Sequence, residues 1–193
     1  MKLQSQSHSD GDLLRLIVAG REEAFLEFYR RHQAAVFRFA LHMSGKTEIA
    51  EEVTQDVFMA VINAARDFDP ARGTAPSLLY GIARNYVRRS MDRNRFYVTS
   101  LDDPGNRHPT PVSPAPDVSI ELARRERVDL LRQSILALPP AYREVVVLCD
   151  LQEVSYEEAA EILGCALGTI RSRLHRARAL LVEKMRARER CVV

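Results

Sequence analysis

The chain has 193 residues, of which 46% are hydrophobic and 28% charged, and its net charge is +2. This length accommodates one large or two small globular domains. The opening segment lacks the apolar stretch of a signal peptide, and no later run is apolar enough to span a bilayer. We therefore expect a cytoplasmic protein without membrane insertion. Three widely spaced cysteines indicate neither a disulfide framework nor a zinc site, so we expect no metal and no cofactor.

Helical periodicity begins at Asp12. A short helix is predicted from Leu13 to Val18, and a longer one runs to about Met43. Its buried stripe comprises Phe25, Phe28 or Tyr29, Val36 and Phe39. A third helix is predicted from about Thr47 to Phe68, with apolar residues on two faces. One face holds Val53, Val57, Val61, Ala64 and Phe68, and the other holds Phe58, Ile62 and Ala65. The second face either joins the core or awaits a partner.

The first turns of this third helix are acidic and polar, with Glu48, Glu51, Glu52, Gln55 and Asp56. Residue types alone favour a solvated face there, because the helix macrodipole stabilises acids near an N-terminus.

A loop is predicted from Asp69 to Pro76, followed by an arginine-rich helix from about Ala75 to Phe96. The inward positions are Leu78, Leu79, Ile82, Ala83 and Val87. Outward positions include Arg84, Asn85, Arg88 and Arg89, with aromatic residues interleaved. Arginines beside aromatic rings suit single-stranded nucleic acid, but a solvated basic helix with core aromatics fits equally well.

The segment from Ser100 to Val118 contains five of the nine prolines and few apolar residues. This composition predicts a flexible linker that spans on the order of 60 Å when extended. Beyond it, a helix is predicted from Ser119 to Leu138, with Val128, Leu131, Ile135 and Leu138 inward. Another is predicted from Ala141 to Leu151, although its VVVL run also fits a buried strand.

The last segment, Ser155 to Leu181, predicts a helix-turn-helix. Ser155 and Glu158 form a capping box, and Gly164 supplies the turn. The second helix begins near Gly168 or Thr169 and buries Ile170, Leu174, Ala177 and Leu181. Its other face holds Arg171, Ser172, Arg173, His175, Arg176 and Arg178. This acid-free face suits phosphates and guanine edges in a DNA major groove, whereas the plainer alternative is a solvated helical hairpin.

Four segments carry a family resemblance: AEEVTQDVFMAV from Ala50, LLYGIARNYVRR from Leu78, the stretch Leu138 to Gly164, and GTIRSRLHRARALL from Gly168. In this order they resemble the bacterial extracytoplasmic-function (ECF) sigma factors of the sigma-70 superfamily. The resemblance implies an all-α fold with two small helical domains, residues 10–97 and 119–188, joined by a flexible proline-rich linker over 98–118.

The resemblance also implies partners. A sigma factor binds the RNA polymerase core, directs it to promoter DNA, and is often held by an anti-sigma protein. The resemblance assigns docking on the clamp helices of the largest subunit to Glu52, Gln55, Asp56 and Phe58. This assignment replaces the interpretation of the acidic first turns as a merely solvated face. Capture of the melted minus-ten strand falls to Asn85, Arg84, Arg88 and Arg89. Duplex minus-thirty-five recognition falls to Thr169, Arg171, Ser172, Arg173, His175 and Arg176.

The sequence departs from the family pattern at three positions. The family usually has Trp at Leu78, an aromatic residue at Ala75 and an acid near Arg89. The extra arginine predicts stronger phosphate contact without added sequence information.

Two other classes of protein, a free-standing DNA-binding regulator and an enzyme, fit the sequence less well. A free-standing helix-turn-helix repressor or activator needs a dimer interface or an effector pocket, and neither is clear in the N-terminal half. An enzyme is not favoured, because the sequence contains no nucleophile elbow, phosphate-binding glycine loop or HExxH motif, and its five histidines do not cluster.

Overall fold

The structure is a computed structural model that describes residues 8–71, 73–98 and 118–189, and the described residues form helices and no strand. The prediction of an all-α fold is therefore confirmed. The N-terminal half contains α1 (Asp10–Val18), α2 (Glu22–Ser44), α3 (Thr47–Ala64) and α4 (Ala75–Val98). The C-terminal half contains α5 (Val118–Leu136), α6 (Pro140–Val146), the π-helical turn η1 (Val147–Leu151), α7 (Tyr156–Leu163) and α8 (Leu167–Glu189). The predicted linker lies almost entirely outside the described residues.

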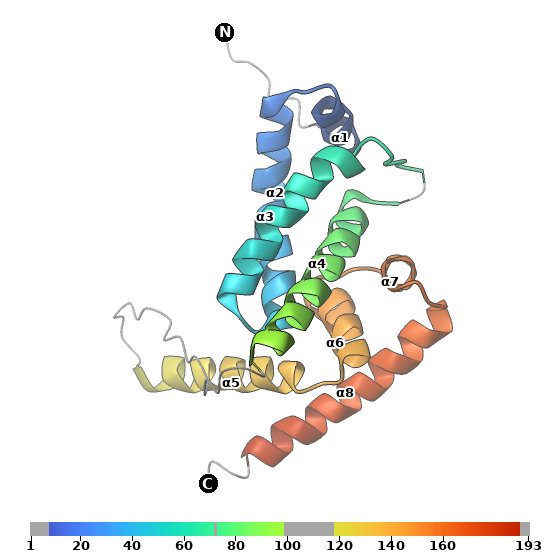
Figure 1. The fold of residues 1–193 in the computed structure, drawn as a ribbon. Coiled ribbons are helices and arrows are strands. Elements are labelled where there is room, and N and C mark those ends of the chain that lie inside the picture. Colours follow the sequence, from blue (N-terminus) through green and yellow to red (C-terminus); the bar gives the residue numbers. More distant parts are fainter. Residues whose placement is uncertain (1–7, 72, 99–117, 190–193) are drawn as a thin grey trace.

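The N-terminal helices pack around one another because each has a continuous apolar stripe. Phe28, Val36 and Phe39 of α2 are buried, as their spacing predicts. α4 contributes Leu79, Ala83 and Val87 to the same core, and α3 crosses beside α2 and α4 in Figure 1. Leu78 and Ile82, which the sequence also predicts to point inward, are both half-buried.

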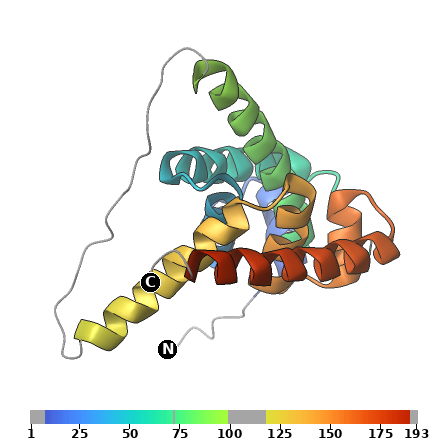
Figure 2. The ribbon, with the colours of Figure 1, turned by 90° about the horizontal axis from the view of Figure 1, so that it is seen from below.

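The C-terminal boundaries of α3 and α5 differ from the prediction. α3 ends at Ala64 instead of Phe68, because the backbone N–H groups of Arg66, Asp67 and Phe68 form i,i+3 hydrogen bonds that tighten the chain toward Pro70. α5 ends at Leu136. Val128 of α5 is predicted to be inward but is 40% exposed, since the N-terminal part of α5 projects away from the other helices (Figures 1 and 2).

The VVVL run is helical, so the strand alternative is excluded. Its residues, Val145 to Leu148, are all buried, where α6 packs on α8 and η1 packs on α2. The helix widens into a single π-helical turn at η1, which is the kind of local irregularity that often lies at functional positions.

The two halves lie against each other. α7 packs on α4, and α5 and η1 pack on α2. Leu136 approaches Gly45 so closely that a Cβ there would lie 2.7 Å from Leu136 Cδ1, and Gly45 itself has a φ of 72°. Glycine therefore suits this joint, because it adopts the left-handed conformation without strain and a Cβ would force the Leu136 side chain to shift.

Candidate nucleic-acid interfaces

The helix-turn-helix forms as its sequence predicts. The Ser155 hydroxyl accepts a hydrogen bond from the Glu158 backbone N–H (3.2 Å), and the Glu158 carboxylate accepts one from the Ser155 N–H (3.2 Å). Gly164 then ends α7 with a left-handed φ of 64°. α8 begins at Leu167, one residue before the predicted start. The turn is therefore built by local interactions that the sequence already contains.

The outer face of α8 is accessible. Ile170, Leu174 and Ala177 are buried beneath it, which leaves the polar residues of the helix facing outward. Arg171, Ser172, His175 and Arg176 are exposed, whereas Thr169 and Arg173 are half-buried. The structure thus brings all six residues predicted for duplex recognition onto one surface of one helix.

Arg178 differs from the other arginines of α8. Its guanidinium donates two hydrogen bonds to the Asp150 carboxylate of η1, with Nη2–Oδ1 at 2.6 Å and Nε–Oδ2 at 3.1 Å. These hydrogen bonds raise the pKa of Arg178 above its ordinary value. The pair links the recognition helix to the π-helical turn, and sequence reasoning did not predict it.

A second polar surface lies where α4 meets the preceding loop. A hollow of about 640 Å³ opens there, and Asp69, Gly73, Ser77 and Asn85 are among the residues that line it. Asn85 and the loop therefore border one pocket. Arg88 and Arg89 are exposed further along α4.

Arg84 is not free in this structure. Its guanidinium forms a bidentate ion pair with Glu144 of α6, with Nε–Oε1 at 2.8 Å and Nη2–Oε2 at 3.3 Å. Both side chains are largely buried, at 18% and 10% exposure. The expectation that Arg84 faces solvent beside Asn85 is therefore wrong for this conformation, because a residue from the other half of the chain covers it.

The predicted polymerase-docking residues divide into two groups. Glu52 and Gln55 are exposed and Asp56 is half-exposed, with Glu52 paired to Arg93 at 2.6 Å. Phe58 is only 2% exposed and packs among aromatic rings, with Tyr29 at a centroid distance of 4.7 Å and Phe25 at 6.5 Å. The expectation that Phe58 faces a partner is wrong here, since the second apolar face of α3 is partly core.

Two other apolar side chains of α3, unlike Phe58, are exposed to solvent. Met59 is 66% exposed and Ile62 is 39% exposed. With Glu52 and Gln55 they recur at steps of three, four and three, so they share one helix face. The sequence reasoning missed Met59, although its spacing from Gln55 and Ile62 was a usable signal.

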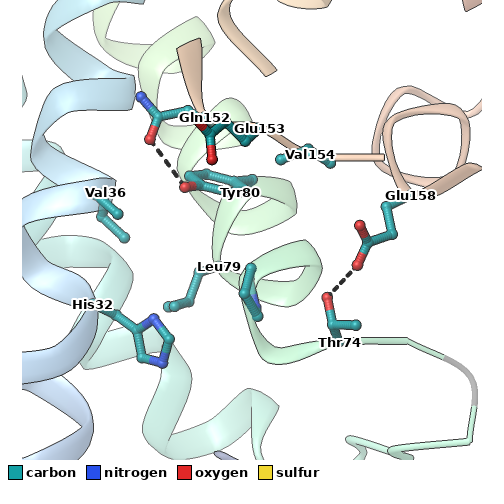
Figure 3. A pocket seen from close by; sticks show the side chains of 11 residues that line it. His32, Val36, Thr74, Leu79, Tyr80, Gln152, Glu153, Val154 and Glu158 are labelled. Atoms are coloured by element: carbon teal, nitrogen blue, oxygen red, sulfur yellow. Dashed lines mark hydrogen bonds between the residues drawn. The ribbon is translucent and has the colours of Figure 1, made fainter. Parts of the chain in front are cut away.

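Several contacts join the loop and α4 to the helix-turn-helix half (Figure 3). Thr74 and Ser77 donate hydrogen bonds from their hydroxyls to Glu158 Oε1, at 2.7 and 3.3 Å. The Tyr80 hydroxyl donates to Gln152 Oε1 at 3.1 Å. A cavity of about 420 Å³ lies between the halves at this point, with Val36, Leu79, Tyr80 and Val154 among its lining residues.

The residues that the structure describes include no group of three or more His, Cys, Asp or Glu side chains placed to hold a metal ion. None of their helices is both long and apolar enough to cross a membrane.

Comparison with known proteins assigns both halves. Residues 28–97 match the family model for sigma-70 region 2, and residues 129–181 match that for sigma-70 region 4. The ECF RNA polymerase sigma factor SigE of Mycolicibacterium smegmatis is 36% identical over 79% of this chain and 58% of its own length. RNA polymerase sigma factor CarQ of Myxococcus xanthus is 33% identical over 81% and 86%. ECF sigma factor SigM of Mycobacterium tuberculosis is 32% identical over 90% and 83%.

Two solved structures are similar to this chain along most of its length. CnrH in complex with the cytosolic domain of CnrY is similar with a TM-score of 0.70 and 27% identity, covering 93% of this chain and 99% of that one. The sigma factor RpoE in complex with the anti-sigma factor NepR from Bartonella quintana is similar with a TM-score of 0.65 and 28% identity, covering 84% and 96%. Sequence and structure therefore show that this chain belongs to the sigma-70 family, among the ECF RNA polymerase sigma factors.

Proposed function

We propose that this chain binds the RNA polymerase core and directs it to specific promoters, with its two halves reading two different forms of DNA. The observation that carries the proposal is the presence of two separate polar surfaces on one chain, the outer face of α8 and the hollow beside Asn85. The first is a helix that fits a duplex groove, and the second is a recess large enough for a base turned out of its stack.

Recognition of the duplex minus-thirty-five element is assigned to α8. The six residues are Thr169, Arg171, Ser172, Arg173, His175 and Arg176. Four of the six are exposed and two half-buried, and the opposite face of the helix is buried. This arrangement supports the role, because the helix can enter a major groove without disturbing the core.

Recognition of the melted minus-ten strand is assigned to α4 and its preceding loop. Asn85 offers both a donor and an acceptor to a base edge, and Arg88 and Arg89 offer charge to phosphates. Arg84 can also contact a phosphate once its ion pair with Glu144 is broken. The hollow beneath Leu78 is open where the family usually places a Trp, which we connect with an altered promoter preference.

Docking on the polymerase is assigned to the exposed face of α3, against the clamp helices of the largest subunit. Glu52, Gln55 and Asp56 supply polar contacts, and we add Met59 and Ile62 as apolar ones. Phe58 supports this face from below, because its ring holds α3 against α2.

The remaining assignments follow from family membership. We assign a polymerase-binding and minus-ten domain to residues 10–97, a linker to 98–118 and a minus-thirty-five domain to 119–188. The protein performs no catalysis of its own and acts in the cytoplasm, where polymerase and promoters are. An anti-sigma protein is also proposed as a partner, since one similar solved structure is a complex with an anti-sigma factor.

Run-off transcription tests the proposal. Core polymerase, this protein and a promoter library are combined, and transcripts are sequenced. The expected result is initiation at a restricted set of promoters that requires both core and protein. Specific binding of duplex DNA without core, and no core-dependent transcript, would instead support a free-standing repressor or activator.

A further inference from the structure

The cavity of about 420 Å³ in Figure 3 has no part in the roles proposed above. Its volume is within the range of small-molecule sites in proteins, which have mostly apolar walls and a few polar groups that orient the ligand. The walls here follow that pattern, because Val36 of α2, Leu79 and Tyr80 of α4, and Val154 before α7 all line the cavity and are buried. A ligand in this cavity therefore needs a compact apolar body.

A buried amide group at the cavity lacks a hydrogen-bond partner. The Tyr80 hydroxyl donates to Gln152 Oε1 at 3.1 Å, and burial raises the pKa of Tyr80, so this hydroxyl keeps its proton at neutral pH. Gln152 Nε2, on the same amide, is buried and has no partner among the residues that the structure describes. Because a buried N–H without an acceptor is costly, a ligand oxygen that accepts from Nε2 would be bound favourably.

Glu153, the next residue, has a strained backbone. The N–H groups of Gln152 and Val154 donate to the carbonyls of Val147 and Leu148, at 3.0 Å each, and Glu153 between them has a φ of 56°. Residues other than glycine rarely adopt this conformation, and the strain that it stores is typical of functional sites. The Glu153 side chain is exposed, lines the cavity and has no hydrogen bond or ion pair with the described part of the chain. Its carboxylate is therefore available to a ligand.

The charges around the cavity favour a cation. Glu153 and Glu158 both line it, and none of its lining residues is a lysine or an arginine. The hydrogen bond from Thr74 is the largest cause of the lowered pKa of Glu158, so this carboxylate is ionised at neutral pH. His32 also lines the cavity, but Asp10 Oδ2 lies 3.0 Å from its Nε2 and would offset a positive charge on the ring.

We propose that this cavity binds a small organic cation, an amine that has a compact apolar body and a hydroxyl or carbonyl oxygen. The body packs between Val36, Leu79 and Val154, the oxygen accepts a hydrogen bond from Gln152 Nε2, and the ammonium group pairs with Glu153. None of these five residues is assigned above to DNA or to polymerase. The proposal is therefore independent of the promoter-directing function.

NMR titration of the full-length protein tests the site with three probes of similar shape. Phenylethanolamine carries a ring, a hydroxyl and an amine, whereas phenethylamine lacks the hydroxyl and phenylethanol lacks the amine. Each is added up to about 10 mM, because ligands of this size are expected to bind with millimolar Kd. We expect saturable shifts of the backbone amide signals of residues 152–154 with phenylethanolamine. Each of the other two probes is expected to bind about two- to fivefold more weakly, because it lacks one polar contact.

Glu153→Gln removes the charge of the ammonium partner and keeps its size. It is expected to weaken phenylethanolamine binding about two- to fivefold and to leave phenylethanol binding unchanged. The matched control is Glu157→Gln, at an exposed position of α7 that does not line the cavity.

Filling the cavity provides a second test. Ala35→Leu, at a half-buried lining position of α2, should abolish binding of all three probes, whereas Ala34→Leu, at the exposed position before it, should not. Circular dichroism confirms that each variant keeps its helices. If Ala35→Leu fails to fold, Glu153→Gln still decides the question.

Four results would each overturn the proposal. They are the absence of saturable shifts with phenylethanolamine, equal affinity for phenylethanol, unchanged amine affinity in Glu153→Gln, and full binding by a folded Ala35→Leu variant. The titration contains neither polymerase nor promoter, so its failure leaves the proposed function standing. Failure of run-off transcription, in turn, leaves the titration unaffected.

Discussion

The Asp150 carboxylate of η1 accepts both hydrogen bonds of a bidentate pair from Arg178 of α8, at 2.6 and 3.1 Å. The π-helical turn therefore presents an acid to the recognition helix just beyond its proposed DNA-reading residues. The Arg178 side chain is 55% exposed, so water screens the pair.

Asp150→Asn is expected to lower the free energy of unfolding by less than about 1 kcal/mol, because exposed ion pairs contribute little. It also frees Arg178 to meet a phosphate, so affinity for duplex DNA should rise modestly for all sequences alike. Urea denaturation and fluorescence anisotropy measure the two effects. A loss of stability well above the roughly 1 kcal/mol of an exposed pair would show that this one anchors α8.

Phe58→Ala is expected to destabilise the protein by about 3–5 kcal/mol, because it empties a buried aromatic site. Met59→Ala, at an exposed position on the same helix, should leave urea denaturation nearly unchanged and weaken binding of the polymerase core. Gln55→Ala removes a proposed polar contact from the same face and is also expected to weaken core binding. Unimpaired core binding by both Met59→Ala and Gln55→Ala would remove the docking role from this face of α3.

Alanine substitutions of Arg171, Arg173 and Arg176 distinguish base reading from phosphate contact. A base-reading arginine contributes about 1–3 kcal/mol of discrimination at its own base pair, whereas a phosphate contact weakens binding to all sequences alike. We expect at least one of the three to read a base. Binding of each variant to a set of minus-thirty-five duplexes provides the measurement. Uniform losses across every variant and duplex would reduce α8 to an electrostatic clamp.

Asn85→Ala is expected to leave folding and core binding normal, because the side chain is exposed beside the hollow. Open-complex formation should fall chiefly on promoters that carry the preferred minus-ten base, since the amide is proposed to match that base edge. Permanganate footprinting on a set of minus-ten variants measures this. Equal loss on all promoters with a lower melting temperature would indicate a structural role instead.

Cys149 is expected to be chemically inert in the folded protein. Burial, and after it the adjacent Asp150 carboxylate, raises the pKa of the Cys149 thiol to about 11. At pH 8 only about 0.1% is then thiolate, against about a quarter at an ordinary pKa near 8.5. Alkylation by iodoacetamide, followed by peptide mass spectrometry, should be roughly 100-fold slower than in the urea-unfolded chain. Comparable rates in both states would contradict this.

The sequence alone determined the helical fold, the helix-turn-helix and the family. Each of these depends on local information. The Ser155–Glu158 capping box and Gly164 lie within one short segment, and the buried positions of α8 recur with the helical period. Such signals need no knowledge of distant residues. Helical spacing is accordingly sufficient to place the six residues of α8 that we propose to read DNA away from its buried side.

The tertiary structure alone decided which faces are covered and which charged groups are paired. Periodicity defines the faces of α3 but not which of them a neighbouring helix buries, so Phe58 was misplaced and Met59 was missed. The partners of Arg84 and Thr74 lie 60 and 84 residues away, at Glu144 and Glu158. Contacts across such separations arise only when helices pack, because the spacing of residues along a chain does not specify the distance between its halves.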